Sequence, residues 1–343
     1  MPKPCLLHPK SVHRKLFLLS IGMFFFSLKI SSQSFDFISL SVEDGLSQSE
    51  ARNVFQDSRG YLWVGTAGGG VCSYDGIKFH EYGAKEGLSG QIITSIAEDS
   101  TGKMWFGTTN GGVSIYDGKT FTTIDSKRGL SENEVQCIII KQDAVWIGLG
   151  SGIFEYTEKN NLLRRIVPFS NLNAICIDEQ GAAWVGTDNG FFSFKNGKKD
   201  SVILPVHPKA DYTILSLLSD KHGLIYIGTN DGLLIYRPST GTFTQTELTG
   251  AVAGKQVRTI FIDHGQNVWV GTMNNLVVRY RGPGKMVRYD KSNGMTAEAV
   301  YEITEDDTRH MWFATREQSL MKLRSESFSY YGNVAGMGSG TVF

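Results

Sequence analysis

Apolar residues along this chain fall in short runs separated by aspartate, asparagine and glycine, a pattern typical of short strands joined by tight turns. One run, a tetrad of the form W-x-G-T at Trp63–Thr66, recurs with small changes at steps of 42, 41, 38, 42, 43 and 43 residues. All six tryptophans of the protein occupy its first position, and a tyrosine fills the remaining copy. The chain is therefore a sevenfold repeat, whose later copies begin at Trp105, Trp146, Trp184, Tyr226, Trp269 and Trp312.

Each unit predicts four strands. A β-rich run such as Val257–Ile262 precedes the tetrad, and turn residues and another strand that ends in an aromatic residue follow it. A fourth strand often comes next, as in Lys78–Tyr82 and Thr120–Ile124. One four-stranded antiparallel meander cannot bury both of its faces, whereas stacked copies can. We therefore predict an all-β fold, a seven-bladed β-propeller in which each tryptophan packs between neighbouring blades and the tetrad glycine makes room for the ring.

An aspartate lies six residues before the aromatic residue in every unit except the third. We predict that it caps the first hairpin turn, because carboxylates repeated in every blade lie too far apart to converge at the ~5–9 Å that a glycosidase needs. The spacing D-x-x-G-x-x-W also differs from the Asp-box of sialidase propellers, S-x-D-x-G-x-x-W. We expect no catalytic residues. The histidines lack metal-ligand spacing, so we expect neither a metal nor a cofactor. The aspartates are Asp57, Asp99, Asp178, Asp220, Asp263 and Asp306.

Composition supports a folded protein rich in turns, because 39 of the 343 residues are glycine, above the usual share of about 7%. The formal net charge is zero, but residues 1–32 hold five basic groups and no acidic one. The rest of the chain carries 29 basic and 34 acidic side chains, a net charge of −5, which argues against nucleic-acid binding. Cys72, Cys137 and Cys176 lie in apolar runs, and we predict small core residues rather than a disulfide framework.

The N-terminus has the order of an export signal. Met1–Lys15 is basic, Leu16–Leu28 is an apolar run of 13 residues, and a small polar stretch follows. The apolar run is shorter than the ~20 residues that span a bilayer. We therefore predict a signal peptide over residues 1–33 and the propeller over residues 34–343, with an uncleaved membrane anchor as the alternative. Both place the body of the protein in the periplasm.

The motif D-x-x-G-x-x-W-x-G-T, followed by a glycine turn and Tyr-Asp, resembles the two-component regulator propeller repeat. So do the phrases that lead three of the units, at Glu43–Ser47, Glu86–Ser89 and Arg128–Ser131. The resemblance covers residues 35–343 and implies the periplasmic sensor region of a hybrid two-component system of the Bacteroidota type. Such regions typically sense oligosaccharides, and an immunoglobulin-like domain, a membrane helix, a histidine kinase and often a response regulator follow them. These output domains do not occur in the 343 residues.

The two ends of the repeat region leave alternatives open. Gly336–Phe343 resembles the opening of a unit, so we expect an eighth repeat to begin there and the chain to be a fragment of a longer sensor. The alternative is a naturally short protein. Phe35–Ser41 resembles the fourth strand of a unit and can close the ring on the last unit, but Ser327–Tyr331 competes for the same place.

Candidate ligand-binding residues are sought where the copies differ. One such position lies five residues before the turn aspartate, near the predicted channel mouth, and holds Arg52, Thr94, Asn173, Leu215, Arg258 and Tyr301. The longest connection, Lys198–Thr213, adds Tyr212 beside His207 and Lys209, and Arg316 with Glu317 replaces the usual turn of the last unit. Aromatic faces and arginine or asparagine donors suit sugars and their acidic groups. We predict ligand binding at Arg52, Asn173, Tyr212, Arg258, Tyr301 and Arg316.

We therefore expect a periplasmic sensor propeller that binds an oligosaccharide or another small ligand and performs no catalysis. Downstream sensor domains, or a second propeller in a propeller–propeller dimer, are the expected protein partners. Two alternatives stay open because a fold does not determine a function. A carbohydrate-active propeller enzyme, hydrolase or lyase, would form product and need a pair of essential acids. A secreted scaffold would bind a protein and no glycan.

Overall fold

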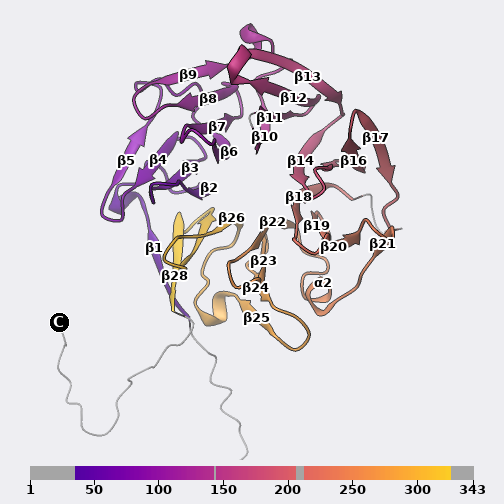
Figure 1. Cartoon of the computed structure of the whole chain (residues 1–343). Coiled ribbons are helices and arrows are strands. Elements are labelled where there is room, and N and C mark those ends of the chain that lie inside the picture. The colour runs from indigo at the N-terminus through magenta and orange to yellow at the C-terminus, as the bar shows by residue number, and fades with distance from the viewer. Residues whose placement is uncertain (1–34, 143, 206–211, 326–343) are drawn as a thin grey trace, which may run out of the picture. The chain divides into compact units, whose positions relative to one another are not determined.

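A computed structural model describes residues 35–142, 144–205 and 212–325 as seven four-stranded antiparallel sheets that follow one another around a ring (Figure 1). The inner strand of each sheet contacts the inner strand of the next sheet, and β2 (Ala51–Gln56) contacts β26 (Val300–Glu305) to complete the circle. The seven-bladed β-propeller is thereby confirmed. The segments at residues 1–33, 207, 209, 327–331 and 336–343, which carry the predicted signal peptide, two connection residues, a competing strand and the eighth repeat, lie outside the described residues.

The first four blades each follow the chain from an inner to an outer strand. Blade 1 contains β2, β3 (Leu62–Thr66), β4 (Val71–Tyr74) and β5 (Phe79–Tyr82). Blade 2 contains β6 (Ile93–Glu98), β7 (Met104–Thr108), β8 (Val113–Tyr116) and β9 (Phe121–Ile124). Blade 3 contains β10 (Val135–Lys141), β11 (Ala144–Leu149), β12 (Gly152–Thr157) and β13 (Leu162–Pro168). Blade 4 contains β14 (Leu172–Ile177), β15 (Ala183–Thr187), β16 (Phe191–Lys195) and β17 (Lys198–Val202).

The last three blades depart from this scheme in two places. Blade 5 contains β18 (Ile214–Ser219), β19 (Ile225–Thr229), β20 (Gly232–Arg237) and the short β21 (Thr242–Phe243), after which α2 (Glu247–Ala251) buries Leu248 against blades 5 and 6. Blade 6 contains β22 (Val257–Ile262), β23 (Val268–Thr272), β24 (Val277–Tyr280) and β25 (Met286–Tyr289). Blade 7 contains β26, β27 (Met311–Thr315) and β28 (Leu320–Ser325). Single 3-10 turns lie at η1 (Val42–Asp44), η2 (Ser126–Arg128), η3 (Glu158–Asn160) and η4 (Lys291–Asn293).

The fourth strand of blade 7 comes from the other end of the chain. β1 (Asp36–Leu40) pairs antiparallel with β28, so the sheet order is β1-β28-β27-β26. The Phe35 ring packs 4.6 Å from the Tyr289 ring, centroid to centroid, inside the core shared by blades 6 and 7. In the structure, Phe35–Ser41 therefore supplies the strand that closes the ring. It also corrects the predicted long connection at Lys198–Thr213, since its first five residues form β17.

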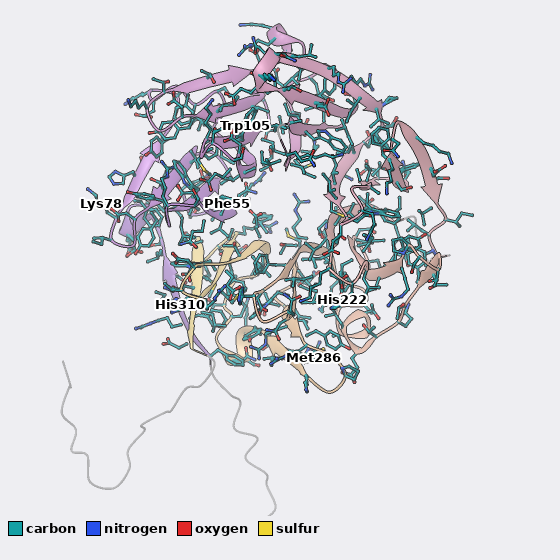
Figure 2. All side chains as sticks on the ribbon, viewed as in Figure 1. Phe55, Lys78, Trp105, His222, Met286 and His310 are labelled. Carbon is teal, nitrogen blue, oxygen red and sulfur yellow. The ribbon has the colours of Figure 1, made fainter. Side chains whose placement is uncertain are left out.

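The tryptophans lie between blades, as the sequence predicts. The Trp63 ring is 5.4 Å from Phe106 and 5.9 Å from Tyr116, both in blade 2. The Trp105 ring, which is labelled in Figure 2, lies 5.7 Å from the Tyr156 ring of blade 3, centroid to centroid. Each ring therefore buries a large apolar area against the next copy, and aromatic pairs at these separations add about 0.5–1.5 kcal/mol beyond that burial.

Each turn aspartate joins its hairpin to this core. Asp57 accepts hydrogen bonds from its own turn through Oδ1 and from Trp63 Nε1 through Oδ2 at 2.9 Å. The same indole bond, at 2.7–2.8 Å, forms in blades 2, 4, 6 and 7. In blade 3, where the turn is shortened, Trp146 Nε1 donates instead to Glu155 Oε2 at 3.0 Å. The aspartates are structural, as predicted, and their bond to the tryptophan is a role that the sequence analysis missed.

The tetrad glycine has a different neighbour from the one predicted. A Cβ on Gly65 would lie 2.6 Å from Ile93 Cγ2, and one on Gly186 would lie 2.2 Å from Ile214 Cγ2. Both isoleucines begin the first strand of the following blade and are fully buried. Glycine thus lets neighbouring inner strands approach each other closely, rather than making room for the tryptophan ring.

Candidate functional site

The inner strand of every blade contains a β-bulge at the same place. In blade 1, Ala51 pairs with Thr66 and Asn53 pairs with Gly65, which leaves Arg52 as the extra residue. The same register shift occurs in the other six blades. Bulges redirect side chains and are frequent beside functional sites. The seven extra residues are Arg52, Thr94, Gln136, Asn173, Leu215, Arg258 and Tyr301.

All seven bulge residues line one cavity at the centre of the ring, with a volume of about 540 Å³. The residue after each bulge also lines it, which adds a second ring of residues that vary from blade to blade. We call this space the central cavity. The second ring consists of Asn53, Ser95, Cys137, Ala174, Ser216, Thr259 and Glu302.

Polar side chains of these two rings tie neighbouring blades together. Asn173 Nδ2 donates to the Ile214 carbonyl at 3.1 Å, and Asn53 Nδ2 donates to the Thr94 carbonyl at 3.2 Å. Ser95 Oγ accepts from the Ile138 amide at 3.0 Å. The cavity wall is therefore held by side-chain bonds as well as by strand packing.

Other polar atoms of the wall have no partner. Among the described residues, four buried side-chain oxygen atoms lack a hydrogen bond, and three of them belong to the lining: Asn53 Oδ1, Thr94 Oγ1 and Ser216 Oγ. Buried polar atoms are normally satisfied, and leaving one unpaired costs about 1–3 kcal/mol. A Cβ on Gly65, Gly107 or Gly228 would lie 3.0, 3.1 or 2.2 Å from these three oxygens in turn, so they face the tetrad glycines of their own blades rather than the open cavity.

The charged groups of the lining are confined to blades 6, 7 and 1. The Arg52 guanidinium lies 5.8 Å from the centre of the Tyr301 ring and pairs with Glu50 at 3.1 Å. Arg316 Nε donates to the Tyr301 hydroxyl at 3.2 Å. Burial within the ring lowers the pKa of Arg258, and the nearby charge of Arg52 lowers it further, against the opposing influence of Tyr301 and Glu302.

Glu302 is the only acid among the described lining residues. Its Oε2 accepts the Val54 amide of blade 1 at 3.0 Å. Burial raises the pKa of its carboxyl to about 7, although the bonds from Val54 and Asn53 and the charge of Arg258 favour the ionised form. The wall therefore contains one carboxyl group that titrates near neutral pH.

This pKa predicts how stability depends on pH. The folded protein holds the Glu302 proton more tightly than the unfolded chain, so this contribution to stability is complete below about pH 4.5 and is lost as the pH rises through 7. We expect wild type to lose about 1–3 kcal/mol relative to Glu302→Gln across that interval. Urea unfolding of both proteins at pH 4.5 and 7.5 measures the difference. Parallel pH dependences would show that Glu302 is not buried as described.

The structure places four of the six predicted ligand-binding residues in the central cavity: Arg52, Asn173, Arg258 and Tyr301. Arg316 is joined to it through Tyr301. Tyr212 lies outside the lining and packs against the core of blades 4 and 5. Ligand binding by all six stays a prediction.

Sequence reasoning missed Gln136 and the second ring. Gln136 was missed because the third unit has no turn aspartate from which to count, although the tryptophan ten residues later is a usable mark. The second ring was missed because strand alternation predicts that the residue after a lining residue faces away, and the sequence does not show that such a residue still borders the cavity.

The described residues give little support for metal binding or for a cysteine nucleophile. They contain no group of three or more histidine, cysteine or acidic residues able to hold a metal ion. Cys137 lines the cavity, but burial raises the pKa of its thiol to about 12, so it is a poor nucleophile. None of the described helices has the length and apolarity needed to cross a membrane.

Comparison with known proteins agrees with the repeat pattern. The family model described as two component regulator propeller matches residues 45–68 and 87–110, which are the leading phrase and first hairpin of blades 1 and 2. The resemblance to the two-component regulator propeller repeat is thereby confirmed for the repeats of blades 1 and 2. No curated protein sequence matches the chain significantly.

Solved structures share the fold at low sequence identity. The extracellular domain of the hybrid two-component system BT4673 from B. thetaiotaomicron has a TM-score of 0.72 and 24% identity over 86% of this chain. The extracellular domain of the hybrid two-component system BT3049 from the same organism has a TM-score of 0.73 and 19% identity over 84% of this chain. The chain spans 40% and 42% of the length of these two domains. A catalytically inactive form of virginiamycin B lyase from Staphylococcus aureus has a TM-score of 0.67 and 14% sequence identity. The match covers 84% of this chain and 99% of the lyase.

Proposed function

We propose that this chain of two-component regulator propeller repeats is the ligand-binding input region of an exported sensor, and that an oligosaccharide binds in its central cavity without being cleaved. Ligand binding would favour one arrangement of the blades, and sensor domains outside these residues would report the change.

The observation that carries this proposal is the cavity built by the seven bulges. Its volume of about 540 Å³ falls within the ~300–1,000 Å³ of typical ligand pockets. Its wall is mainly polar and differs in every blade, with Gln136, Asn173 and Arg258 among the polar bulge residues. Sugars offer many hydroxyl donors, so a hydroxyl-rich ligand is the class that best satisfies such a wall.

The absence of catalysis is supported by the single acid of the lining. Glycosidases of both stereochemical types use two carboxyl groups that flank the scissile bond, and Glu302 has no acidic partner among the described lining residues. The likeness to extracellular domains of two-component systems favours a sensor, and the export signal predicted at the N-terminus agrees with it.

Calorimetric titration with a panel of neutral and acidic oligosaccharides tests the proposal. We expect saturable binding of one ligand per chain, recovered unchanged by mass spectrometry. Leu215→Trp, which fills the cavity at a position without a side-chain hydrogen bond, should weaken binding at least 10-fold because the ligand loses its space. Ile203→Trp, at a residue that is 90% exposed, is the matched control and should have no effect.

Three results would contradict the proposal. Cleaved sugar in the recovered ligand would favour a propeller enzyme. Unchanged affinity in a folded Leu215→Trp protein would place the site elsewhere on the molecule. A stable protein partner together with no glycan affinity would favour a binding scaffold.

A further inference from the structure

The central cavity is electrostatically one-sided. Its charged bulge residues are Arg258 in blade 6 and Arg52 in blade 1, and Tyr301 of blade 7 lies between these two blades around the ring. The bulge residues of blades 2 to 5 are neutral: Thr94, Gln136, Asn173 and Leu215. A ligand in the cavity therefore meets cations on one side and uncharged hydrogen-bonding groups on the other.

Arg258 is the cation best placed to take a ligand. Its side chain is exposed to the cavity, and it has neither an ion pair nor a side-chain hydrogen bond within the part of the chain that the structure describes. Arg52 by contrast is paired with Glu50. Surrounding protein and the charge of Arg52 both oppose the charge of Arg258, and an anion bound beside it would relieve this cost.

Glu302 is not the anion that pairs with Arg258. It acts electrostatically on Arg258, but no ion pair joins the two side chains, and its Oε2 is already bonded to the Val54 amide across the seam between blades 7 and 1. The guanidinium of Arg258 therefore keeps its five donors for a ligand, and a planar carboxylate can take two of them at once.

The wall away from these cations is neutral and polar. Gln136 and Asn173 are half-buried bulge residues of blades 3 and 4, and both line the cavity. Amide side chains of this kind can form hydrogen bonds with hydroxyl groups. A ligand that carries both hydroxyls and an anionic group fits such a wall.

We propose that the central cavity selects acidic oligosaccharides, with Arg258 binding the carboxylate of a uronic acid residue. Arg52 adds attraction at longer range, and sugar hydroxyls bond to the neutral side of the wall, where Gln136 and Asn173 lie. This inference rests on the proposed function and specifies its ligand class. Arg258 is then the residue that distinguishes acidic from neutral sugars, because removing it would leave the anionic group without its bidentate partner.

Matched pairs of ligands test the inference on the full chain. Oligomers of galacturonate, glucuronate and mannuronate are titrated beside their methyl esters, which keep the sugar and lose the charge. We expect at least one acid to bind about 10- to 100-fold more tightly than its ester, the range of a charge-assisted hydrogen bond. A sulfated galactan oligomer of the same length tests the other common anionic group.

Variants then assign the preference to one side chain. Arg258→Gln should abolish the difference between acid and ester, and Arg258→Lys should retain part of it because the charge remains. Arg281→Gln, on the exposed outer hairpin of the same blade, should behave as wild type. Thermal melting of each protein without ligand shows that it is folded, and the comparison of ligands on wild type needs no variant.

The outcomes separate this inference from the proposed function. Equal affinity for acids and esters would overturn the inference and leave oligosaccharide binding intact. Tighter binding of the sulfated oligomer than of every uronate would overturn the assignment to a carboxylate. Failure of all neutral and acidic oligosaccharides to bind would overturn both proposals.

Discussion

Phe35→Ala should lower the free energy of unfolding by about 3–5 kcal/mol, the usual cost of removing a buried phenylalanine ring. Phe35 is 7% exposed, packs against Tyr289, and donates its backbone amide to the Asn293 carbonyl at 2.8 Å. It leads directly into β1, the strand that closes the ring on β28. The substitution therefore removes core volume at the point where the two ends of the described chain meet.

Urea unfolding monitored by tryptophan fluorescence measures this effect. Ile77→Ala is the matched control, because that side chain is 88% exposed on the outer turn of blade 1 and its loss should change stability by less than about 0.5 kcal/mol. An effect of Phe35→Ala as small as that of the control would mean that β1 contributes little to ring closure, and would favour another closing strand.

Gly186→Ala should destabilise the protein by about 1–3 kcal/mol, the cost of overpacking a filled core. Its Cβ would lie 2.2 Å from Ile214 Cγ2 and 2.7 Å from Ile214 Cβ. Ile214 is fully buried at the start of the inner strand of blade 5, so it has no free space into which to move. The expected strain acts between two blades rather than within one.

Gly250→Ala is the control for this substitution. Gly250 lies in α2, and nothing stands within 4 Å of the position that its Cβ would take. Alanine is the better helix former, so this change should be neutral or stabilising by up to about 1 kcal/mol. Equal stability of the two variants in thermal and urea unfolding would contradict the close approach of neighbouring inner strands.

The blades could be predicted because their defining contacts are local. Asp57 and Trp63 lie six residues apart and bond to each other, so a pattern that recurs in the chain corresponds directly to a hairpin. The ring follows because seven similar sheets each need a neighbour. Ring closure could not be predicted, since Phe35–Ser41 and Ser327–Tyr331 have similar patterns, and the packing of Phe35 against Tyr289 is a contact between distant parts of the chain.

The site could be predicted only in part. Counting back from the turn aspartate finds Arg52, Asn173, Arg258 and Tyr301, because the bulge occurs at a constant offset from the turn. The offset does not show that two consecutive residues border the cavity, which is how Glu302 was missed. The variable composition of a loop does not indicate which way its side chains point. Tyr212 packs against the core of blades 4 and 5 and does not line the central cavity.

A crystal structure of the protein with the oligosaccharide that binds most tightly in the titrations tests the central claim most directly. The account predicts an intact sugar inside the ring of seven bulge residues, in contact with Arg258 and with hydrogen bonds to Gln136 or Asn173. A sugar bound on the outer strands with the central cavity unchanged, or a cleaved product within it, would contradict the account.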